Sequence, residues 1–530
     1  MLSTRGFTGM SVLLAVMALI APTATAWSHA QTRATSADLV GIVRDTTGGV
    51  LPGATVRATN VDTNQSRTVV TGDAGRYAIP ALPPGVYRVS IALTGFAEEV
   101  RQNVQVSIGS LVELNVTLAL AGATEAVRVV ADAPIVDTQK TTIATVVSQE
   151  QIEYLPIDGR NFISFAVLTP AVSTDRTPQQ GASATSGLTF AGQRARSNNI
   201  TVDGLSNNDP AVGSVRASFS QEAVREFQVL TNSYTAEFGN ATGGVLNIVT
   251  RSGTNRFAGN GFVFLRDDVL NAKGHFEQVD PFGQPVDLEK APYSQTQFGA
   301  TLGGPLRRDR TFFFLSAERL NIAAANLVTI DDRTIVPHPF LGTPLGSPVQ
   351  ILRAAGFPVE TGNVGYDVSH TQVLAKVDHQ LPRTQNLTVR FNIGDELNEN
   401  IEPFGGITAS SRAAALDSRD IILAATHTAV FRSSWVNELR FQRPSTHTIG
   451  QSRRRDRAHG ANGPRRRLDR GFAESRSSPP PEVTRRIGIM RRSCGSVRRL
   501  VAWRCVESTC QRRSIRSVLS RPAGPVPPPG

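Results

Sequence analysis

Hydrophobic and polar residues alternate with a period of two in a series of segments between residues 253 and 442. The segment VLAKVDHQL (373–381) places valine, alanine and valine on one side of an extended chain and mostly polar residues on the other. NLTVRFNI (386–393) repeats the alternation after a turn that contains proline. The pattern predicts a β-hairpin with one apolar and one polar face. Five further segments with this pattern are 257–266, 295–303, 311–320, 420–431 and 435–442.

The alternation alone fits two kinds of antiparallel sheet. In a soluble β-sandwich the apolar face packs in a core and the polar face meets water. In a transmembrane barrel the apolar face meets lipid and the polar face lines the lumen. The aromatic-rich segment TFFFLSAERL (311–320) favours the barrel. The long polar connections 267–292 and 321–370 are then expected to be extracellular loops.

Residues 38–120 predict a separate, smaller β-domain. GIVRDTTGGVLPGATV (41–56) and TGDAGRYAIPALPPGVYRV (71–89) each alternate short apolar runs with Gly, Pro and Asp turns. About seven short strands in this length predict a β-sandwich. Both stretches resemble the carboxypeptidase regulatory-like domain, which is a transthyretin-like sandwich without a peptidase site. Tyr77 and Tyr87 are expected in its core, with sugar binding as the alternative role.

Residues 121–252 mix helical and extended patterns, which predicts a small α/β unit. Ser148 and Gln151 have the spacing of a capping box. The run FISFAVL (162–168) has an apolar helical face and ends at Pro170. A polar loop is expected at 194–209, followed by a strand, a short helix, Gly-Gly and a second strand within 226–255.

Three strings in this region resemble a known family. They are SNNITVDGLSNND (197–209), VREFQVLTNSYTAEFGNATGGVLNIVTRSGTN (224–255) and LGGPLRRDRTFFF (302–314). They resemble the plug and first barrel segments of a TonB-dependent outer-membrane receptor of the Oar-like type, in which a regulatory-like sandwich precedes the plug. The resemblance implies a mainly β protein with an N-terminal β-sandwich, an α/β plug domain (121–252), an antiparallel transmembrane β-barrel (253–442) and a C-terminal tail.

The resemblance also implies two sets of functional residues. A plug loop that carries hydrogen-bond donors and acceptors would meet a ligand that enters the barrel, and the same Asn and Asp side chains would alternatively cap turns. These residues are Arg194, Arg196, Asn198, Asn199, Asp203, Asn207, Asn208 and Asp209. A segment ahead of the plug would bind a periplasmic TonB-type energy-coupling protein. Its residues are Glu125, Val127, Val129 and Val130.

The N-terminus predicts export. Arg5 precedes the apolar run MSVLLAVMALIA, which is shorter than a transmembrane helix, and small residues follow. A signal peptide is therefore expected over residues 1–30, with cleavage after Ala30. Since no later segment has 18 consecutive apolar residues, a membrane role would depend on β-strands.

The distribution of charged residues along the chain changes at residue 442. The formal net charge is +11, yet residues 443–530 alone contribute +16 through 21 arginines and five acidic residues. Tyrosine and lysine are absent from this tail, and proline-rich blocks predict disorder. The tail would be a basic arm for nucleic acid, a basic arm for anionic lipid, or translation in a wrong reading frame. Its composition favours the third, so no nucleic-acid partner is expected.

No enzyme, cofactor or metal site is predicted. The chain has no G-x-S-x-G, P-loop, H-E-x-x-H or dinucleotide motif. All three cysteines lie in the tail, with spacing that does not match a zinc site.

The preferred function is the N-terminal portion of an energy-coupled outer-membrane receptor for a bulky solute: a siderophore, a glycan or a peptide. The chain would lie in the outer membrane of a Gram-negative bacterium, in contact with its lipid. About seven predicted strands are fewer than the roughly 22 of a plugged transporter, so an incomplete barrel and no transport by this chain are expected. The alternative is an exported β-sandwich protein for carbohydrate binding or adhesion.

Overall fold

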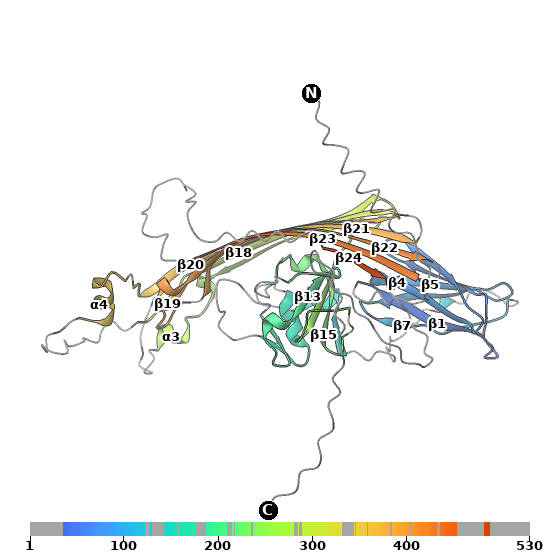
Figure 1. Cartoon of the computed structure of the whole chain (residues 1–530), viewed down its shortest axis with the longest axis horizontal. Coiled ribbons are helices and arrows are strands. Elements are labelled where there is room, and N and C mark those ends of the chain that lie inside the picture. Colours follow the sequence, from blue (N-terminus) through green and yellow to red (C-terminus); the bar gives the residue numbers. More distant parts are fainter. Residues whose placement is uncertain are drawn as a thin grey trace, which may run out of the picture. The chain divides into compact units, whose positions relative to one another are not determined.

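Three groups of β-strands follow one another along the chain in the computed structural model (Figure 1). The structure describes residues 35–121, 128–129, 143–452 and 482–487, with gaps at 156–159, 161, 175–186, 209–214, 217, 235–236, 280–284, 286–288, 331–343, 345, 358, 382–383, 403 and 432–434. All described residues fall within one compact unit, Met1–Met490. The predicted signal peptide and its cleavage site at Ala30 lie outside the described residues.

The first group is a two-sheet sandwich, as the sequence predicts. Its strands are β1 (Ala37–Asp45), β2 (Thr55–Asn60), β3 (Ser66–Val70), β4 (Arg76–Leu82), β5 (Gly85–Ala92), β6 (Glu99–Val106), β7 (Leu111–Glu113), β8 (Val116–Leu118) and β9 (Arg128–Val129). One sheet has the order β4-β1-β7, with β8 also pairing β1, and the other has the order β3-β2-β5-β6-β9. Alternate apolar side chains of both sheets form a shared core.

Tyr77 and Tyr87 lie in this core, which confirms the preferred interpretation of both residues. They are 5% and 3% exposed. The Tyr77 hydroxyl donates to the carbonyl of Leu114 at 2.7 Å, and the Tyr87 hydroxyl donates to the carbonyl of Pro83 at 2.8 Å. Their polar ends are therefore paired with the backbone of the same domain.

The second group is a five-stranded mixed sheet with the order β10-β15-β16-β13-β14. These strands are β10 (Ile143–Val147), β13 (Asn199–Val202), β14 (Leu205–Ser206), β15 (Val224–Asn232) and β16 (Val245–Thr250), and a separate pair, β11 (Val172–Thr174) and β12 (Leu188–Phe190), lies beside them. Helix α2 (Gln149–Tyr154) begins with the predicted capping box at Ser148. We call this group the plug.

Three predictions for the plug differ from the structure. Residues 162–168 form a 3-10 helix, η2 (Phe162–Leu168), although Phe165 and Ala166 are buried as expected. The described residues between β15 and β16 contain turns and bends but no helix. The expected polar loop 194–209 contains β13, all four residues of which are buried. This strand cannot be recognised from the hydrophobic pattern of the sequence, because its polar residues Asn199 and Thr201 interrupt that pattern.

The third group is a sheet of eight consecutive antiparallel strands, which we call the barrel sheet (Figure 1). The strands are β17 (Ala258–Asp267), β18 (Tyr293–Arg307), β19 (Thr311–Val328), β20 (Gly362–Gln380), β21 (Gln385–Glu402), β22 (Ala414–Phe431), β23 (Trp435–Ser452) and β24 (Glu482–Ile487). All seven strands predicted from alternation are present. Short helices α3 (His275–Gln278) and α4 (Pro348–Ala354) lie in the two long connections.

Several barrel strands are longer than the sequence predicts. Strands β19 and β20 extend into the expected loop 321–370, so the connection between them is shorter than predicted. Strand β23 runs to Ser452, past the boundary expected at residue 442, and β24 lies within the expected tail. Backbone hydrogen bonds to the facing strand can continue where side-chain alternation fails, because the ladder uses only main-chain groups.

The barrel sheet has its polar face buried and its apolar face exposed, which decides between the two kinds of sheet. Leu315, Val377, Phe391 and Leu423 on one face are 36–45% exposed. On the opposite face, polar side chains are buried; they include Gln297, Ser316, Glu318, Lys376, Arg390, Asn392, Glu438 and Arg440. A soluble sandwich would have the reverse arrangement, so the sheet has the character of a lipid-facing barrel wall.

No helix among the described residues has the length and hydrophobicity required to cross a bilayer.

Candidate functional site

The candidate site is the tip of the β13–β14 hairpin, where the plug meets the barrel sheet. Val202 pairs with Leu205, so Asp203 and Gly204 form the two-residue turn. Both turn residues have positive φ, at 48° and 74°. Such a turn favours Asp-Gly, because Asp tolerates the left-handed region and Gly has no side chain to clash.

The carboxylate of Asp203 is held by residues from the plug and from two barrel strands. Thr250 at the end of β16 donates its backbone N–H at 2.9 Å and its hydroxyl at 2.8 Å. From β21, Arg390 Nη1 donates to Oδ2 at 2.9 Å. From β20, Lys376 Nζ lies 3.9 Å from Oδ1 and donates to the Thr250 carbonyl at 3.1 Å.

Strand β23 holds the rest of the turn. Arg440 Nη1 donates to the carbonyl of Gly204 at 2.9 Å, and Gln442 Nε2 donates to the carbonyl of Ser206 at 3.0 Å. Arg440 is itself oriented by Glu438, whose Oε1 accepts a hydrogen bond from Nε at 2.8 Å. We call this set of contacts the hairpin latch; it joins Asp203–Ser206 to Lys376, Arg390, Arg440 and Gln442.

The latch brings three barrel cations together with two carboxylates, Asp203 and Glu438. Burial of Asp203 would raise its pKa, but the neighbouring Lys376 and Arg390 cations and the Thr250 hydrogen bonds together hold the pKa below its usual value. Lys376, Arg390 and Arg440 are each no more than 5% exposed. A buried cation is costly without a partner, so Asp203 and the hairpin carbonyls compensate charges that the barrel sheet presents to the plug.

The predicted ligand-facing residues divide into two groups. The Asn side chains pair with backbone atoms of the plug. Asn198 Nδ2 donates to the carbonyl of Leu188 at 2.7 Å, Asn199 Nδ2 to that of Gly239 at 2.6 Å, and Asn208 Nδ2 to that of Asn198 at 2.6 Å. The bonded residues are 10 to 40 positions apart in the sequence, so these Asn side chains join separate segments of the plug.

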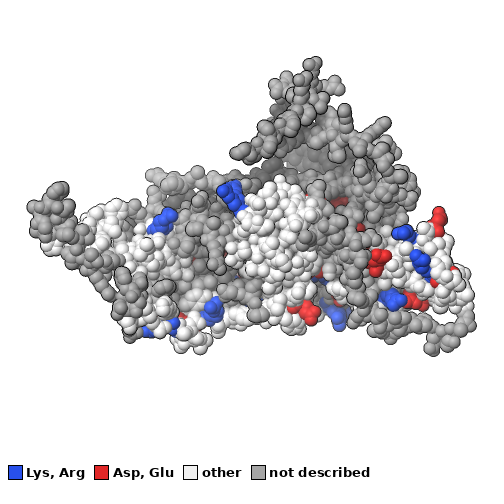
Figure 2. Space-filling model, turned by 90° about the horizontal axis from the view of Figure 1, so that it is seen from below, with Lys and Arg blue, Asp and Glu red and all other residues white. Residues whose placement is uncertain are grey.

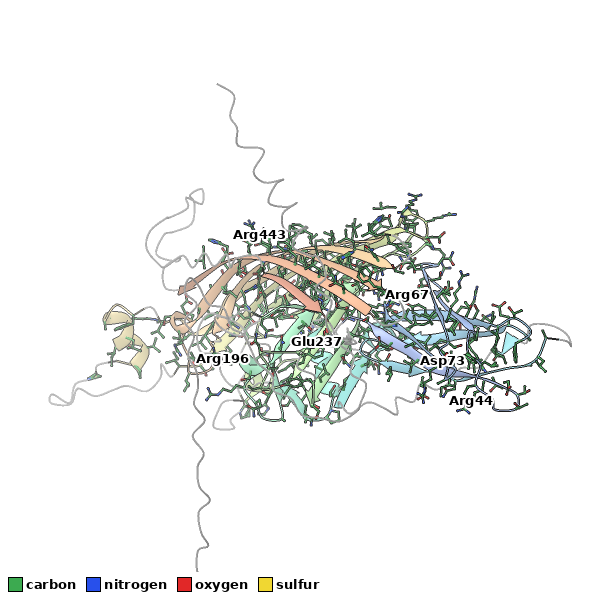
Figure 3. The ribbon with its side chains drawn as sticks, turned by 45° about the vertical axis from the view of Figure 1, so that its right-hand side comes forward. Arg44, Arg67, Asp73, Arg196, Glu237 and Arg443 are labelled. Carbon is green, nitrogen blue, oxygen red and sulfur yellow. The ribbon has the colours of Figure 1, made fainter. Side chains whose placement is uncertain are left out.

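Arg194 and Arg196 are exposed (Arg196 is labelled in Figure 3). Asn207 is buried, and its backbone pairs with Ile200 and Arg216. Asp209 lies outside the described residues. The structure therefore brings Asp203 into the hairpin latch and leaves Arg194 and Arg196 on the plug surface.

Sequence reasoning missed the barrel half of the latch. Lys376 and Arg390 appeared only as polar members of alternating segments, and nothing in one strand indicates which residue will meet Asp203. The available signal was charge on the lumen-facing side of neighbouring strands: Lys376 and Arg390 are directly paired in the register of β20 and β21.

The predicted coupling segment lies only partly within the described residues. Glu125, Val127 and Val130 are outside them. Arg128 and Val129 form β9, which pairs in parallel with Val100 and Arg101 of β6.

The sandwich contacts the plug through Glu226 of β15. Its Oε1 accepts a hydrogen bond from the backbone N–H of Ile108 at 2.6 Å, and the residue is 4% exposed. Burial raises the pKa of Glu226 to about 7, against the opposing effects of the Ile108 hydrogen bond, the Arg225 charge and the Ser107 hydroxyl. Glu226 is more deeply buried than Asp203, and its pKa is shifted in the direction opposite to that of Asp203.

Metal binding and surface charge add no further site. Among the described residues, no group of three or more His, Cys, Asp or Glu side chains is placed to hold a metal ion. On the face shown in Figure 2, acidic and basic side chains of the described residues are interspersed. This part of the surface therefore shows no extended patch of one sign.

Three family models match consecutive parts of the chain. They describe a carboxypeptidase regulatory-like domain (residues 38–119), a TonB-dependent receptor plug domain (137–245) and an outer membrane beta barrel domain (249–337). The TonB-dependent transporter Oar of Myxococcus xanthus is 34% identical over 267 residues. Over these three consecutive domains the chain matches the Oar-like TonB-dependent receptors. The plug and outer-membrane barrel models place the matched part of the chain in the outer membrane of a Gram-negative bacterium.

The match to Oar covers 49% of this chain and 24% of Oar, so the chain spans about a quarter of that relative. Among solved structures, the siderophore receptor PirA from Acinetobacter baumannii has 19% identity and a TM-score of 0.39, covering 59% of this chain and 41% of PirA. The outer membrane transporter YddB from Escherichia coli has 15% identity and a TM-score of 0.39, covering 57% of this chain and 39% of YddB.

Proposed function

We propose that this Oar-like receptor chain is the N-terminal portion of a transporter for energy-coupled uptake of a bulky solute. The proposal makes residues 38–120 an accessory sandwich, 121–252 the plug and the strands from residue 253 the barrel wall. The plug blocks the lumen at rest and rearranges when a periplasmic TonB-type protein pulls on the segment that contains Glu125, Val127, Val129 and Val130. The whole receptor would be a transporter and not an enzyme, with outer-membrane lipid and the coupling protein as its partners. Because the barrel sheet has eight strands among the described residues, fewer than the roughly 22 of a plugged transporter, we expect no transport by this chain alone.

The hairpin latch is the observation that supports this proposal most directly. A plug that must stay in place and still move needs attachments that are specific and can be broken. Hydrogen-bonded ion pairs meet both needs, because they fix geometry and are worth little once water enters. A permanent domain contact would more often be apolar.

The exposed guanidinium groups of Arg194 and Arg196 support a role for this part of the plug in meeting the solute. Exposed arginines provide donors for carboxylate, phosphate or hydroxyl groups of a ligand. Asn198, Asn199 and Asn208 then shape the plug, since their amide groups are already paired with its backbone. The solute is proposed as a siderophore, a glycan or a peptide.

The proposal is tested by membrane association of the full chain expressed in a Gram-negative host. We expect the chain in the outer-membrane fraction, extracted by detergent and not by salt or carbonate. An adhesion or carbohydrate-binding protein built from soluble sandwiches predicts the opposite result. A monomeric chain that stays in the supernatant without detergent would overturn the receptor proposal.

A further inference from the structure

A second attachment between plug and barrel lies away from the hairpin latch, at Arg160. This residue follows α2 and has a φ of +53°, in the left-handed region that non-glycine residues seldom adopt. Its Nη2 donates to Oε1 of Glu222 at 2.6 Å, with 17% and 14% of the two side chains exposed. The geometry directs the guanidinium from an early plug segment toward the barrel wall.

The guanidinium group of Arg160 lies against two aromatic rings of the first barrel strand. Arg160 Cζ lies 4.4 Å from the ring centre of Phe262 and 4.7 Å from that of Phe264. The two rings are 5.7 Å apart. These distances are within the range of cation–π attraction. Arg160 therefore contacts two alternate residues of β17 at once.

Both phenylalanines lie on the lumen-facing side of β17. Phe262 pairs with Gly299, which in turn pairs with Glu318 of β19, and Glu318 is one of the buried polar residues of the inner face. A Cβ at Gly299 would lie 2.6 Å from Cζ of Phe262. The absence of a side chain at residue 299 thus leaves space for the ring that contacts Arg160.

Glu222 connects this contact to other parts of the plug and the barrel. Its second oxygen accepts a hydrogen bond from Nδ2 of Asn260 on β17 at 2.9 Å. Glu222 belongs to the short 3-10 turn η4 (Gln221–Ala223). Gln221 in this turn donates to the carbonyl of Ile152 in α2 at 2.6 Å, and the preceding Ser220 is hydrogen bonded to Glu318. Arg160 thus closes a polar network between α2, η4 and two barrel strands.

We propose that Arg160 is a positioning residue that fastens the early segment of the plug to β17, independently of the hairpin latch. The aromatic pair Phe262–Phe264 and the carboxylate of Glu222 form the binding site of its guanidinium group. The latch holds β13 and β14 at one edge of the plug sheet, whereas Arg160 holds the segment that follows β10 at the other edge. This inference relies on the proposed function only in treating β17 as part of the barrel wall.

Hydrogen exchange of the full chain in detergent micelles tests the inference without any transport assay. Arg160→Ala should speed exchange in α2 and η4 by about two- to fivefold, the loss expected for a cation–π contact with a partly exposed ring. Exchange in the hairpin 199–206 should not change. Arg160→Lys keeps the charge but loses the planar stacking surface, so its exchange should lie between those of wild type and Arg160→Ala.

Two further variants distinguish a positioning role of Arg160 from a general loss of folding. Phe264→Leu keeps an apolar side chain and should reproduce part of the Arg160→Ala effect, with little added effect in the double variant because both changes remove one contact. Arg88→Ala on an exposed sandwich strand should leave plug exchange unchanged. Sandwich exchange over residues 37–118 reports correct folding of each variant, and Arg160→Lys provides the test if Arg160→Ala does not fold.

Unchanged exchange in α2 and η4 of Arg160→Ala would overturn the inference. So would an equal increase in the hairpin 199–206, because a single attachment would then hold the whole plug. Additive effects of Arg160→Ala and Phe264→Leu would also count against the assigned binding site. Each of these results can occur whether or not the chain takes up a solute.

Discussion

Arg390 donates a hydrogen bond of 2.9 Å to Asp203 across 187 residues of sequence. The two residues belong to a barrel strand and to the tip of a plug hairpin, and Lys376 is a second cation beside Asp203. Neither residue could be buried alone at low cost. The contact therefore makes the position of the plug and the charge pattern of the barrel wall depend on each other.

The losses caused by removing Asp203 and by removing Arg390 should not add, because the two residues share one contact. Asp203→Ala leaves Arg390 and Lys376 buried without their carboxylate, and we expect the opening free energy of the hairpin 199–206 to fall by about 3–5 kcal/mol. Arg390→Ala should cost less, because Lys376 and Thr250 still contact the Asp203 carboxylate. Hydrogen exchange of the hairpin in the full chain measures both. A double variant whose loss equals the sum of the two single losses would show that the residues are not coupled.

The same pair determines how the latch responds to acid. The pKa of Asp203 is lowered from 3.8 in the folded protein, so the latch is at full strength above pH 3.8 and weakens only as the pH falls below this value. Asp203→Asn should weaken the latch at neutral pH and remove this acid dependence.

Gly204 provides a separate test of the latch through its backbone. A Cβ at this residue would lie 2.5 Å from Cζ of Arg440, and φ is +74°. We expect Gly204→Ala to destabilise the hairpin both by backbone strain of about 1–2 kcal/mol and by displacing Arg440. Gly192→Ala is the matched control, since Gly192 has a φ of +77° and open space around it.

Denaturant unfolding of the full chain in micelles compares the two glycine variants. Both should lose stability through backbone strain, and only Gly204→Ala should also lose the contact with β23. If the two variants have equal effects, Arg440 does not hold the turn.

Because the pKa of Glu226 is raised, we expect the contact between sandwich and plug to depend on pH. Burial raises its pKa from 4.5 to about 7, so the folded protein binds an additional proton in this range. The stability associated with this group is complete below pH 4.5, falls as the pH rises and is lost above about pH 7. The raised pKa corresponds to about 3 kcal/mol.

Glu226→Gln tests this dependence because glutamine keeps an acceptor for the Ile108 N–H but does not titrate. Between pH 4.5 and 8, the free energy of unfolding of the wild type should fall more than that of Glu226→Gln, by up to the same amount. Denaturant unfolding in micelles at several pH values measures the difference. Glu98→Gln on the exposed sandwich surface is the control. Parallel pH profiles for wild type and Glu226→Gln would contradict the prediction.

The sequence was sufficient for features that depend on neighbours along the chain. The capping box at Ser148 and the seven alternating strands of the barrel sheet use spacings of two to four residues, which a single sequence shows directly. The resemblance to known strings supplied the order of sandwich, plug and barrel. The buried strand β13 was missed because its polar residues, Asn199 and Thr201, are paired by tertiary contacts that leave no periodic signal.

The hairpin latch could not be predicted for the same physical reason. Its partners are separated by more than a hundred residues, and strand register together with the docking of the plug decides which charges meet. Asp203 was identified as a candidate, but as part of a ligand-facing loop. The structure instead places its carboxylate against Lys376 and Arg390. Among the described residues of that loop, Arg194, Arg196 and Ser206 are exposed.

The outward face of β23 leads to a last prediction, about residues beyond Phe441. In the register of β22 and β23, Arg443 pairs with Leu423 and Ser445 pairs with Ile421, both of which are exposed apolar residues of the lipid-type face. Arg443, labelled in Figure 3, is itself exposed. An arginine in the middle of such a face costs about 2–4 kcal/mol in a bilayer. Pro444, between them, has no N–H for the strand ladder.

These residues fit the proposal that the chain is translated out of frame from about residue 443 onward, even though the backbone of β23 continues to Ser452. We expect the coding DNA near codon 443 to contain an insertion or deletion of one or two bases. In another frame, the codons downstream should restore apolar residues at the positions of Arg443 and Ser445 and continue the period of two. Sequencing of the gene provides the measurement. If neither alternative frame contains alternating segments beyond this point, the arginine-rich residues are the native sequence and the proposal is wrong.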